Sequence, residues 1–230
     1  MGMFLSITGV IGKAQEEVLS SLTKYAKSVG GGLEKEVLST DNYNCSIIES
    51  VNGNTTIIYP NNYLEWDTSS EFISKDLNTP VFSFHIHDGD LWMYVLFVNG
   101  EIVDQFNPIP DYWDGNISDD EIQSWKGSAT IINKYVEFVK PEDIEKYLVR
   151  WDLDIETGEK AYEGDEFVQE DWQLLDFMKK MRLPFPLNEK WQPNATTFKL
   201  WTKELSLKQS NPNGTKVPIN VIKKPWWKIW

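Results

Sequence analysis

The 230-residue sequence is poor in the side chains that most metal and redox sites need. It contains one cysteine, Cys45, and two histidines. A single thiol excludes an intramolecular disulfide and a zinc site built on several cysteines, and two histidines exclude a catalytic zinc site with three histidine ligands. Cys45 lies in an apolar-leaning run, so we expect it to be a small buried side chain.

Several motifs of familiar enzyme classes are also absent. The chain has no Gly-x-x-x-x-Gly-Lys-Ser/Thr phosphate loop and no Gly-x-Ser-x-Gly nucleophile motif. The consecutive glycines at 30–32 follow a predicted helix instead of a strand, which is the wrong order for a dinucleotide site. The sequence has no apolar run of about 18 residues, so no transmembrane helix is predicted. The first residues lack the regions of a secretory signal, and we therefore expect a cytoplasmic protein.

The charge that is present is divided unevenly along the chain. Residues 1–183 contain 33 acidic and 14 basic side chains, a net charge of −19. Residues 184–230 contain eight lysines and two glutamates, a net charge of +6, together with five of the eleven tryptophans. A strongly acidic surface repels nucleic-acid phosphates, so nucleic acid is not the partner that we expect for residues 1–183.

This asymmetry predicts an acidic α+β domain over 1–183 and a basic, tryptophan-rich extension over 184–230. Several exposed tryptophans would lower solubility, whereas lysines docked on an acidic domain would reduce its self-repulsion. We therefore expect the extension to be an irregular strap docked on the domain, with one helical or strand-like stretch at 197–207. The alternative is a free tail that contacts a membrane surface or nucleic acid.

Periodicity and turn residues predict an α+β fold whose sheet is mostly antiparallel. The predicted strands are an N-terminal strand at 3–9, a hairpin at 44–51 and 54–59, and a three-stranded meander at 81–87, 91–98 and 101–106. The middle strand of the meander is apolar on both faces, so we expect it at the centre of the sheet, covered by helices.

Capping residues and apolar spacing predict the helices that pack on this sheet. They cover 13–29, Thr68 to about Lys75, Ser118 to Trp125, Pro141 to about Arg150, and 170–182. In the last of these, Trp172, Leu175, Met178 and Met181 are expected to face inward. The order of strand, helix and hairpin, followed by helix and meander, points to a split β-α-β arrangement.

Both histidines stand in one short segment, 85–90, with the sequence His-Ile-His-Asp-Gly-Asp. Residues i and i+2 of a strand point to the same face, so both imidazoles would project together beside two turn carboxylates. Such a ligand set, completed by Asp104 or Asp111, is acceptable for a first-row metal. The segment also fits an ordinary strand and turn without metal. One hypothesis is therefore a metal-dependent enzyme centred on His85, His87, Asp88 and Asp90.

The leading hypothesis is a non-enzymatic protein that captures a basic protein partner without a cofactor. The proline-broken loop at 107–115 carries adjacent aromatic and acidic residues, and two aspartates begin the next predicted helix. Aromatic anchors and acidic steering suit a protein interface. The expected partner-binding residues are Asp111, Tyr112, Trp113, Asp114, Asp119 and Asp120. Bacterial toxin-immunity proteins are similar in composition alone, being small, acidic and cytoplasmic; the likeness covers no motif.

Overall fold

The computed structural model describes residues 4–35, 44–49, 52–60, 63, 65–151, 160, 162–164, 172–185 and 196–202, with the backbone alone described at 35, 44–49 and 201. Its fold is α+β, with an antiparallel sheet packed against helices, as predicted. The strands are β1 (Leu5–Val10), β2 (Gly32–Lys35), β3 (Asn44–Glu49), β4 (Thr55–Ile58), β5 (Val81–His87), β6 (Leu91–Val98), β7 (Glu101–Phe106) and β8 (Thr196–Trp201). The helices are α1 (Gln15–Ser28), α2 (Trp66–Leu77), α3 (Asp119–Ser124), α4 (Ala129–Tyr135), α5 (Pro141–Ile144), the 3-10 helix η1 (Glu145–Tyr147) and α6 (Gln173–Lys180).

The strands form one sheet in the order β2-β8-β3-β4-β1-β5-β6-β7. β1 pairs antiparallel with β4 on one side and with β5 on the other. β4 and β5 are therefore parallel to each other, with β1 between them, and the chain joins them through α2. This confirms the predicted split β-α-β arrangement.

The predicted hairpin and meander are both present. β3 pairs with β4, and β5, β6 and β7 pair in sequence order. Asn99 and Gly100 join β6 to β7 with φ angles of 52° and 80°, as a tight hairpin turn of this hand requires. β6 is buried along nearly its whole length, but it lies next to the edge strand β7 and not at the centre of the sheet.

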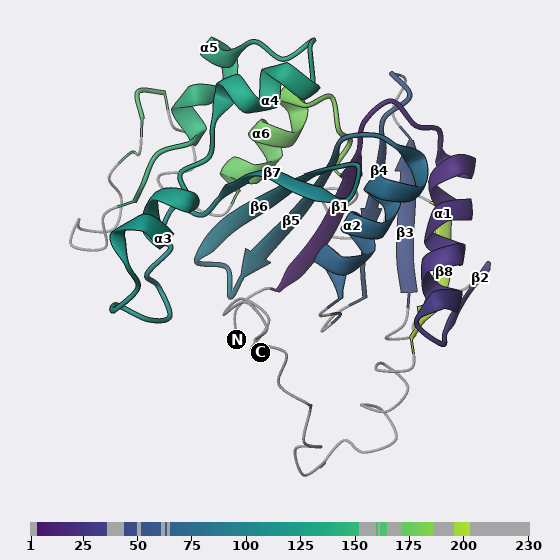
Figure 1. Cartoon of the computed structure of the whole chain (residues 1–230). Helices are drawn as coiled ribbons and strands as arrows, with labels where there is room; N and C mark the ends of the chain where they lie inside the picture. The colour runs from purple at the N-terminus through teal and green to yellow at the C-terminus, as the bar shows by residue number, and fades with distance from the viewer. Residues whose placement is uncertain are drawn as a thin grey trace.

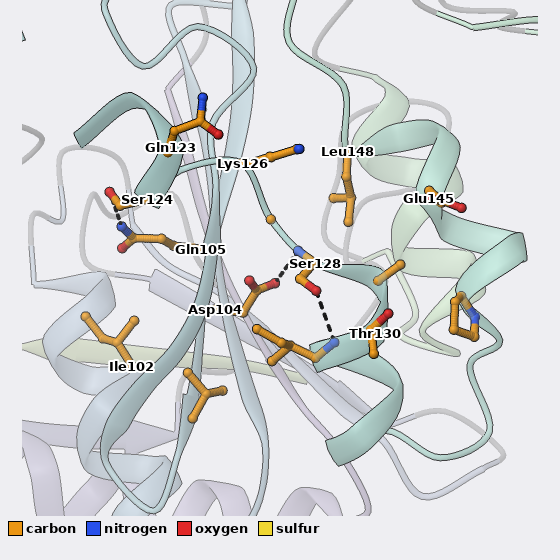
Figure 2. A pocket seen from close by; sticks show the side chains of 15 residues that line it. Ile102, Asp104, Gln105, Gln123, Ser124, Lys126, Ser128, Thr130, Glu145 and Leu148 are labelled. Atoms are coloured by element: carbon orange, nitrogen blue, oxygen red, sulfur yellow. Dashed lines mark hydrogen bonds between the residues drawn. The ribbon is translucent and has the colours of Figure 1, made fainter. Parts of the chain in front are cut away.

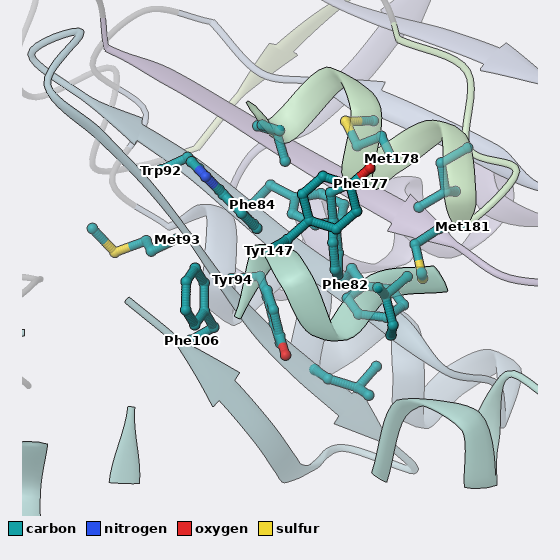
Figure 3. Packing of buried hydrophobic residues seen from close by; sticks show 14 of the residues in the cluster. Phe82, Phe84, Trp92, Met93, Tyr94, Phe106, Tyr147, Phe177, Met178 and Met181 are labelled. Carbon is teal, nitrogen blue, oxygen red and sulfur yellow. The ribbon is translucent and has the colours of Figure 1, made fainter. Parts of the chain in front are cut away.

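Helices cover both faces of the sheet (Figure 1). Successive side chains of a strand point to opposite faces, so β5 presents Val81 to one face and Phe82 to the other. Val81 shares a core cluster with the buried faces of α1 and α2. On the opposite face, Phe177 of α6 packs edge-on against Phe82 and stacks with Tyr94, at centroid distances of 6.3 and 5.5 Å (Figure 3). The aromatic residues that the sequence supplies in excess are concentrated in this second layer.

Several predicted helix boundaries are wrong. α2 begins at Trp66, with Glu65 as its N-cap, so Thr68 lies inside the first turn and does not start a capping box. α5 and η1 end at Tyr147, short of Arg150. In α6 and the residue after it, Met178 and Met181 are buried as predicted, together with Leu174 and Phe177, whereas Trp172 and Leu175 are half-buried.

Two elements were not predicted at all, and one differs from its prediction. β2 and α4 had no assigned element in the sequence. β8 begins the stretch at 197–207 that was expected to be helical or strand-like, but it lies inside the sheet, between β2 and β3, and not in a strap docked on the domain. Phe198 and Leu200 are buried, which is the alternating pattern of a paired strand. Residues 203–230, with most of the extension's lysines and three of its tryptophans, lie outside the described residues, as does the side chain of Cys45.

Among the helices that the structure describes, none has both the length and the apolar content needed to cross a bilayer.

Candidate functional site

The two histidines of β5 lie side by side but have different surroundings. Their ring centroids are 5.9 Å apart. His85 stacks on the indole ring of Trp66 at 5.0 Å, and its Nδ1 shares a 3.1 Å hydrogen bond with Ser6 Oγ. Burial, with a smaller contribution from His87, lowers the pKa of His85 to about 3. His85 is therefore a neutral side chain that joins α2 to β1 and β5.

His87 faces the loop that follows β7. Its Nε2 accepts a 3.3 Å hydrogen bond from the indole Nε1 of Trp113, and the two rings pack edge-to-face at 4.8 Å. Phe4 packs against the same imidazole at 4.9 Å. Burial lowers the pKa of His87, against the opposing charges of Asp88 and Asp90. An unprotonated Nε2 is the form that can accept the bond from Trp113.

The loop at 107–115 is held at both of its sides. The Tyr112 hydroxyl donates a 2.5 Å hydrogen bond to Asp90 Oδ2 in the β5–β6 turn, and this bond raises the pKa of Tyr112 to about 12. Arg150 donates a 2.6 Å hydrogen bond to Asp111 Oδ2. The Trp151 amide also donates to the Pro108 carbonyl at 2.9 Å. These bonds hold Tyr112 and the part of the loop that precedes it.

The meander explains why the loop reaches the histidine strand. β7 is antiparallel to β6, and Phe106 at its end pairs with Tyr94, near the start of β6. The chain therefore leaves β7 at the same end of the sheet as the β5–β6 turn. The structure thus joins residues from both sequence hypotheses, since His87 and Asp90 hold Trp113 and Tyr112.

The remaining predicted partner-binding residues are exposed carboxylates. Asp114 accepts hydrogen bonds from the backbone and side chain of Asn116, at 2.9 and 3.3 Å. Asp119 and Asp120 begin α3, where the Ser118 hydroxyl caps the helix by accepting from the Glu121 amide at 3.2 Å. The predicted cap at Ser118 is therefore confirmed, and it leaves both aspartates facing solvent.

The predicted metal ligands do not converge on one point. Within the described ranges, no group of three or more histidine, cysteine, aspartate or glutamate side chains is placed to hold a metal ion. His87 Nε2 and Asp90 contact Trp113 and Tyr112 instead. Asp104 bonds to Tyr94 and to the Ser128 amide.

Some contacts at this site carry no signal in the sequence. Trp66 and Ser6 belong to distant segments, and nothing in their spacing from His85 indicates that they meet it. Arg150 is likewise 39 positions from Asp111. What the sequence does show is the local chemistry of the loop, in which prolines, aromatic residues and acids stand together.

Comparison with known proteins gave no match to a family model, to a curated protein or to a solved structure.

Proposed function

We propose that this protein binds a basic protein partner through an aromatic–acidic surface formed by Asp111, Tyr112, Trp113, Asp114, Asp119 and Asp120. The observation that carries the proposal is the hydrogen bond between Trp113 and His87, which fixes an indole that stays partly exposed. A side chain that is already ordered loses little conformational entropy on binding. Large aromatic residues held in this way are typical binding hot spots.

The charge around these two aromatic residues supports a cationic partner. Asp114, Asp119 and Asp120 are exposed, and no ion pair in the described part of the chain involves them. Asp111 is already paired with Arg150, so its role is to position the loop. The whole chain has a formal charge of −13, which adds long-range attraction for a basic protein.

Site-directed cross-linking in the source cell tests whether this surface meets a partner. A photoreactive phenylalanine analogue is placed at Tyr112 and, as a control, at Glu16, which is exposed on α1. We expect one protein of high isoelectric point to be captured from position 112 and not from position 16. Equal capture from both positions, or capture of an acidic protein, would refute the proposal.

Charge reversal then tests how the captured partner is held. With purified partner, Asp119→Lys/Asp120→Lys should weaken binding at least about tenfold, mainly through a slower association rate, and should reduce its salt dependence. Glu16→Lys/Glu71→Lys changes the net charge equally at exposed positions of α1 and α2 and should have a much smaller effect. Trp113→Ala should cost about 2 kcal/mol or more of binding free energy, as a hot spot does.

The second hypothesis, a metal-dependent enzyme at His85, His87, Asp88 and Asp90, has a separate test. Its support is the 5.9 Å spacing of the two imidazoles. Metal would have to displace Trp113 from His87 Nε2. Elemental analysis of the purified protein and of His87→Ala decides the matter: stoichiometric metal that is lost in the variant supports the enzyme, and equal trace metal in both refutes it.

A further inference from the structure

Among the strands that the structure describes, β7 is the last of the sheet, and its outer side is the floor of a groove. β7 pairs with β6 on one side and ends the strand order. A cavity of about 890 Å³ runs along its other side. Figure 2 shows Gln105 and Asp104 pointing to opposite sides of β7, toward Ser124 and Ser128 respectively. The residues that line the groove come from β7, from the chain around the end of α3 and the start of α4, and from α5 and η1.

Helices from both faces of the sheet extend beyond this edge and form the walls of the groove. On one side, Trp125 at the end of α3 packs on Val95 and Phe97 of β6. On the other, Ala129 of α4 packs in the cluster that contains Tyr94. Alternate residues of β6 face opposite sides of the sheet, so the two helices lie over opposite faces. The space between them lies beside the outer side of β7, where an additional strand of the sheet would be placed.

The protein itself shows that this edge can pair. Lys126 forms an isolated antiparallel bridge with Phe106, the last residue of β7. Gly127 then turns the chain away with a φ of 70°. A Cβ at Gly127 would lie 3.0 Å from the Tyr94 hydroxyl and 3.2 Å from Phe106 Cβ, so a side chain here would crowd the wall. The chain therefore starts a strand beside β7, but no strand in the described part of the chain pairs with the outer side of residues 101–105.

The stretch at 101–105 is short and apolar at one point. Five residues of extended chain span about 16 Å. Ile102 is 52% exposed, and it is one of two large apolar side chains that stand exposed in the described ranges. The pairing register shifts between Leu96 and Phe97, which places a bulge at this edge. A bulge limits indiscriminate pairing with other edges, so a ligand must fit a short segment.

Acidic side chains flank the groove on the helices next to it. α3 carries Asp119, Asp120 and Glu121, and α5 carries Glu142 and Asp143; neither helix contains a basic residue. A second copy of this chain would bring two such pairs of acidic helices together, which is unfavourable. The lining itself contains Glu145 and Lys126, so the preference for an extended segment with lysine or arginine residues comes from these flanking carboxylates.

We propose that the β7 edge binds an extended, basic segment of the partner as an additional antiparallel strand. The proposal rests on the function proposed above and names the form in which the partner is recognised. α3 joins the two regions: Asp119 belongs to the aromatic–acidic surface, and Ser124, about 7.5 Å further along the helix axis, lines the groove. Backbone pairing supplies affinity in such strand addition, and alternate side chains supply specificity.

A synthetic peptide of alternating lysine and valine is the probe, with an analogue N-methylated at alternate residues that keeps the charge and loses the backbone donors. We expect the first peptide to bind and the methylated peptide to bind at least about tenfold more weakly. NMR amide shifts should change at Glu101–Gln105. A peptide with glutamate in place of lysine should not bind.

Two variants of Ile102 test the edge on the protein side. Ile102→Lys should lower the affinity for the lysine–valine peptide about tenfold or more. Ile102→Val keeps an apolar β-branched side chain and should bind the peptide with normal affinity. Equal binding of the lysine–valine peptide and its N-methylated analogue, or no binding by either of them, overturns the strand proposal. Shifts confined to α3 overturn it as well, and so does a dimer that Ile102→Lys dissociates. If Asp119→Lys/Asp120→Lys weakens binding of the partner identified by cross-linking but Ile102→Lys does not, the strand proposal is wrong, while the proposed aromatic–acidic surface stands.

Discussion

The hydroxyl group of Tyr94 donates a 2.6 Å hydrogen bond to Asp104 Oδ2, between neighbouring strands in the interior. The Ser128 amide donates to the same oxygen at 3.1 Å, so this carboxyl links β6, β7 and the start of α4. Burial raises the pKa of Asp104, although both bonds favour the charged form. The wall of the β7 groove therefore depends on a buried polar contact.

Tyr94→Phe removes one donor and leaves the Asp104 oxygen underpaired. We expect the free energy of unfolding to fall by about 1–3 kcal/mol, measured by urea denaturation. Tyr112→Phe is the matched control, because its acceptor, Asp90, is exposed and water can replace the lost donor. A loss in the control as large as that in Tyr94→Phe would contradict this explanation.

A side chain at Gly9 of β1 would require the buried Leu183 to move. A Cβ there would lie 2.4 Å from Leu183 Cδ1 and 3.2 Å from Phe84 Cε2, where the chain after α6 crosses the sheet. We expect Gly9→Ala to destabilise the fold by about 1–3 kcal/mol through overpacking. Gly115→Ala meets no atom within 4 Å and should be near neutral in the same thermal unfolding experiment.

Asn54 ties the end of α6 to the sheet. Its Nδ2 donates to the Met181 and Arg182 carbonyls at 3.2 Å each, and its Oδ1 accepts from the Gly12 amide at 2.9 Å. The side chain is 2% exposed, so Asn54→Ala would leave buried backbone groups unpaired. We expect a loss of about 1–3 kcal/mol. Asn116→Ala, at an exposed loop position, should lower the free energy of unfolding far less. Similar losses in the two variants would argue against a stabilising role for the Asn54 hydrogen bonds.

His85 predicts a specific dependence of stability on pH. Its folded pKa of about 3 lies below the ordinary value of 6.5, so the unfolded chain binds the proton more tightly. The contribution of His85 to the free energy of unfolding is therefore greatest above pH 6.5. It falls as the pH drops from 6.5 toward 3, by at most about 1.4 kcal/mol per pH unit. The quantity to measure is the difference in unfolding free energy between wild type and His85→Gln, in which most carboxylate contributions cancel. We expect the wild type to lose more unfolding free energy than His85→Gln does between pH 7 and pH 4. A constant difference would show that His85 titrates normally.

Local chemistry explains which parts of the fold were predictable. Asn99-Gly100 and the apolar run of β6 specify a hairpin almost by themselves, and Ser118 caps α3 as its sequence indicates. α4 was missed because its sequence, Ala-Thr-Ile-Ile-Asn-Lys-Tyr, is rich in residues that favour strands. Its helix depends on the Ser128 cap and on packing against Tyr94 and its neighbours, which are tertiary effects.

The candidate site shows the same division. The aromatic and acidic residues of the loop could be identified from sequence, because they are consecutive. The bond from Trp113 to His87 spans 26 positions and depends on how β7 delivers the loop to the β5–β6 turn. Such a relationship follows from topology and not from spacing along the chain.

The place of β8 in the sheet has a consequence for how the protein is made. β2, near the start of the chain, pairs with β8 and has no other neighbour in the strand order, and β3 needs β8 on its outer side. During synthesis, β2 has no strand to pair with, and β3 can pair only with β4, until residues 196–201 have left the ribosome. Folding of this half is thus completed only after residue 201 has been translated, and pairing over such a separation is intrinsically slow.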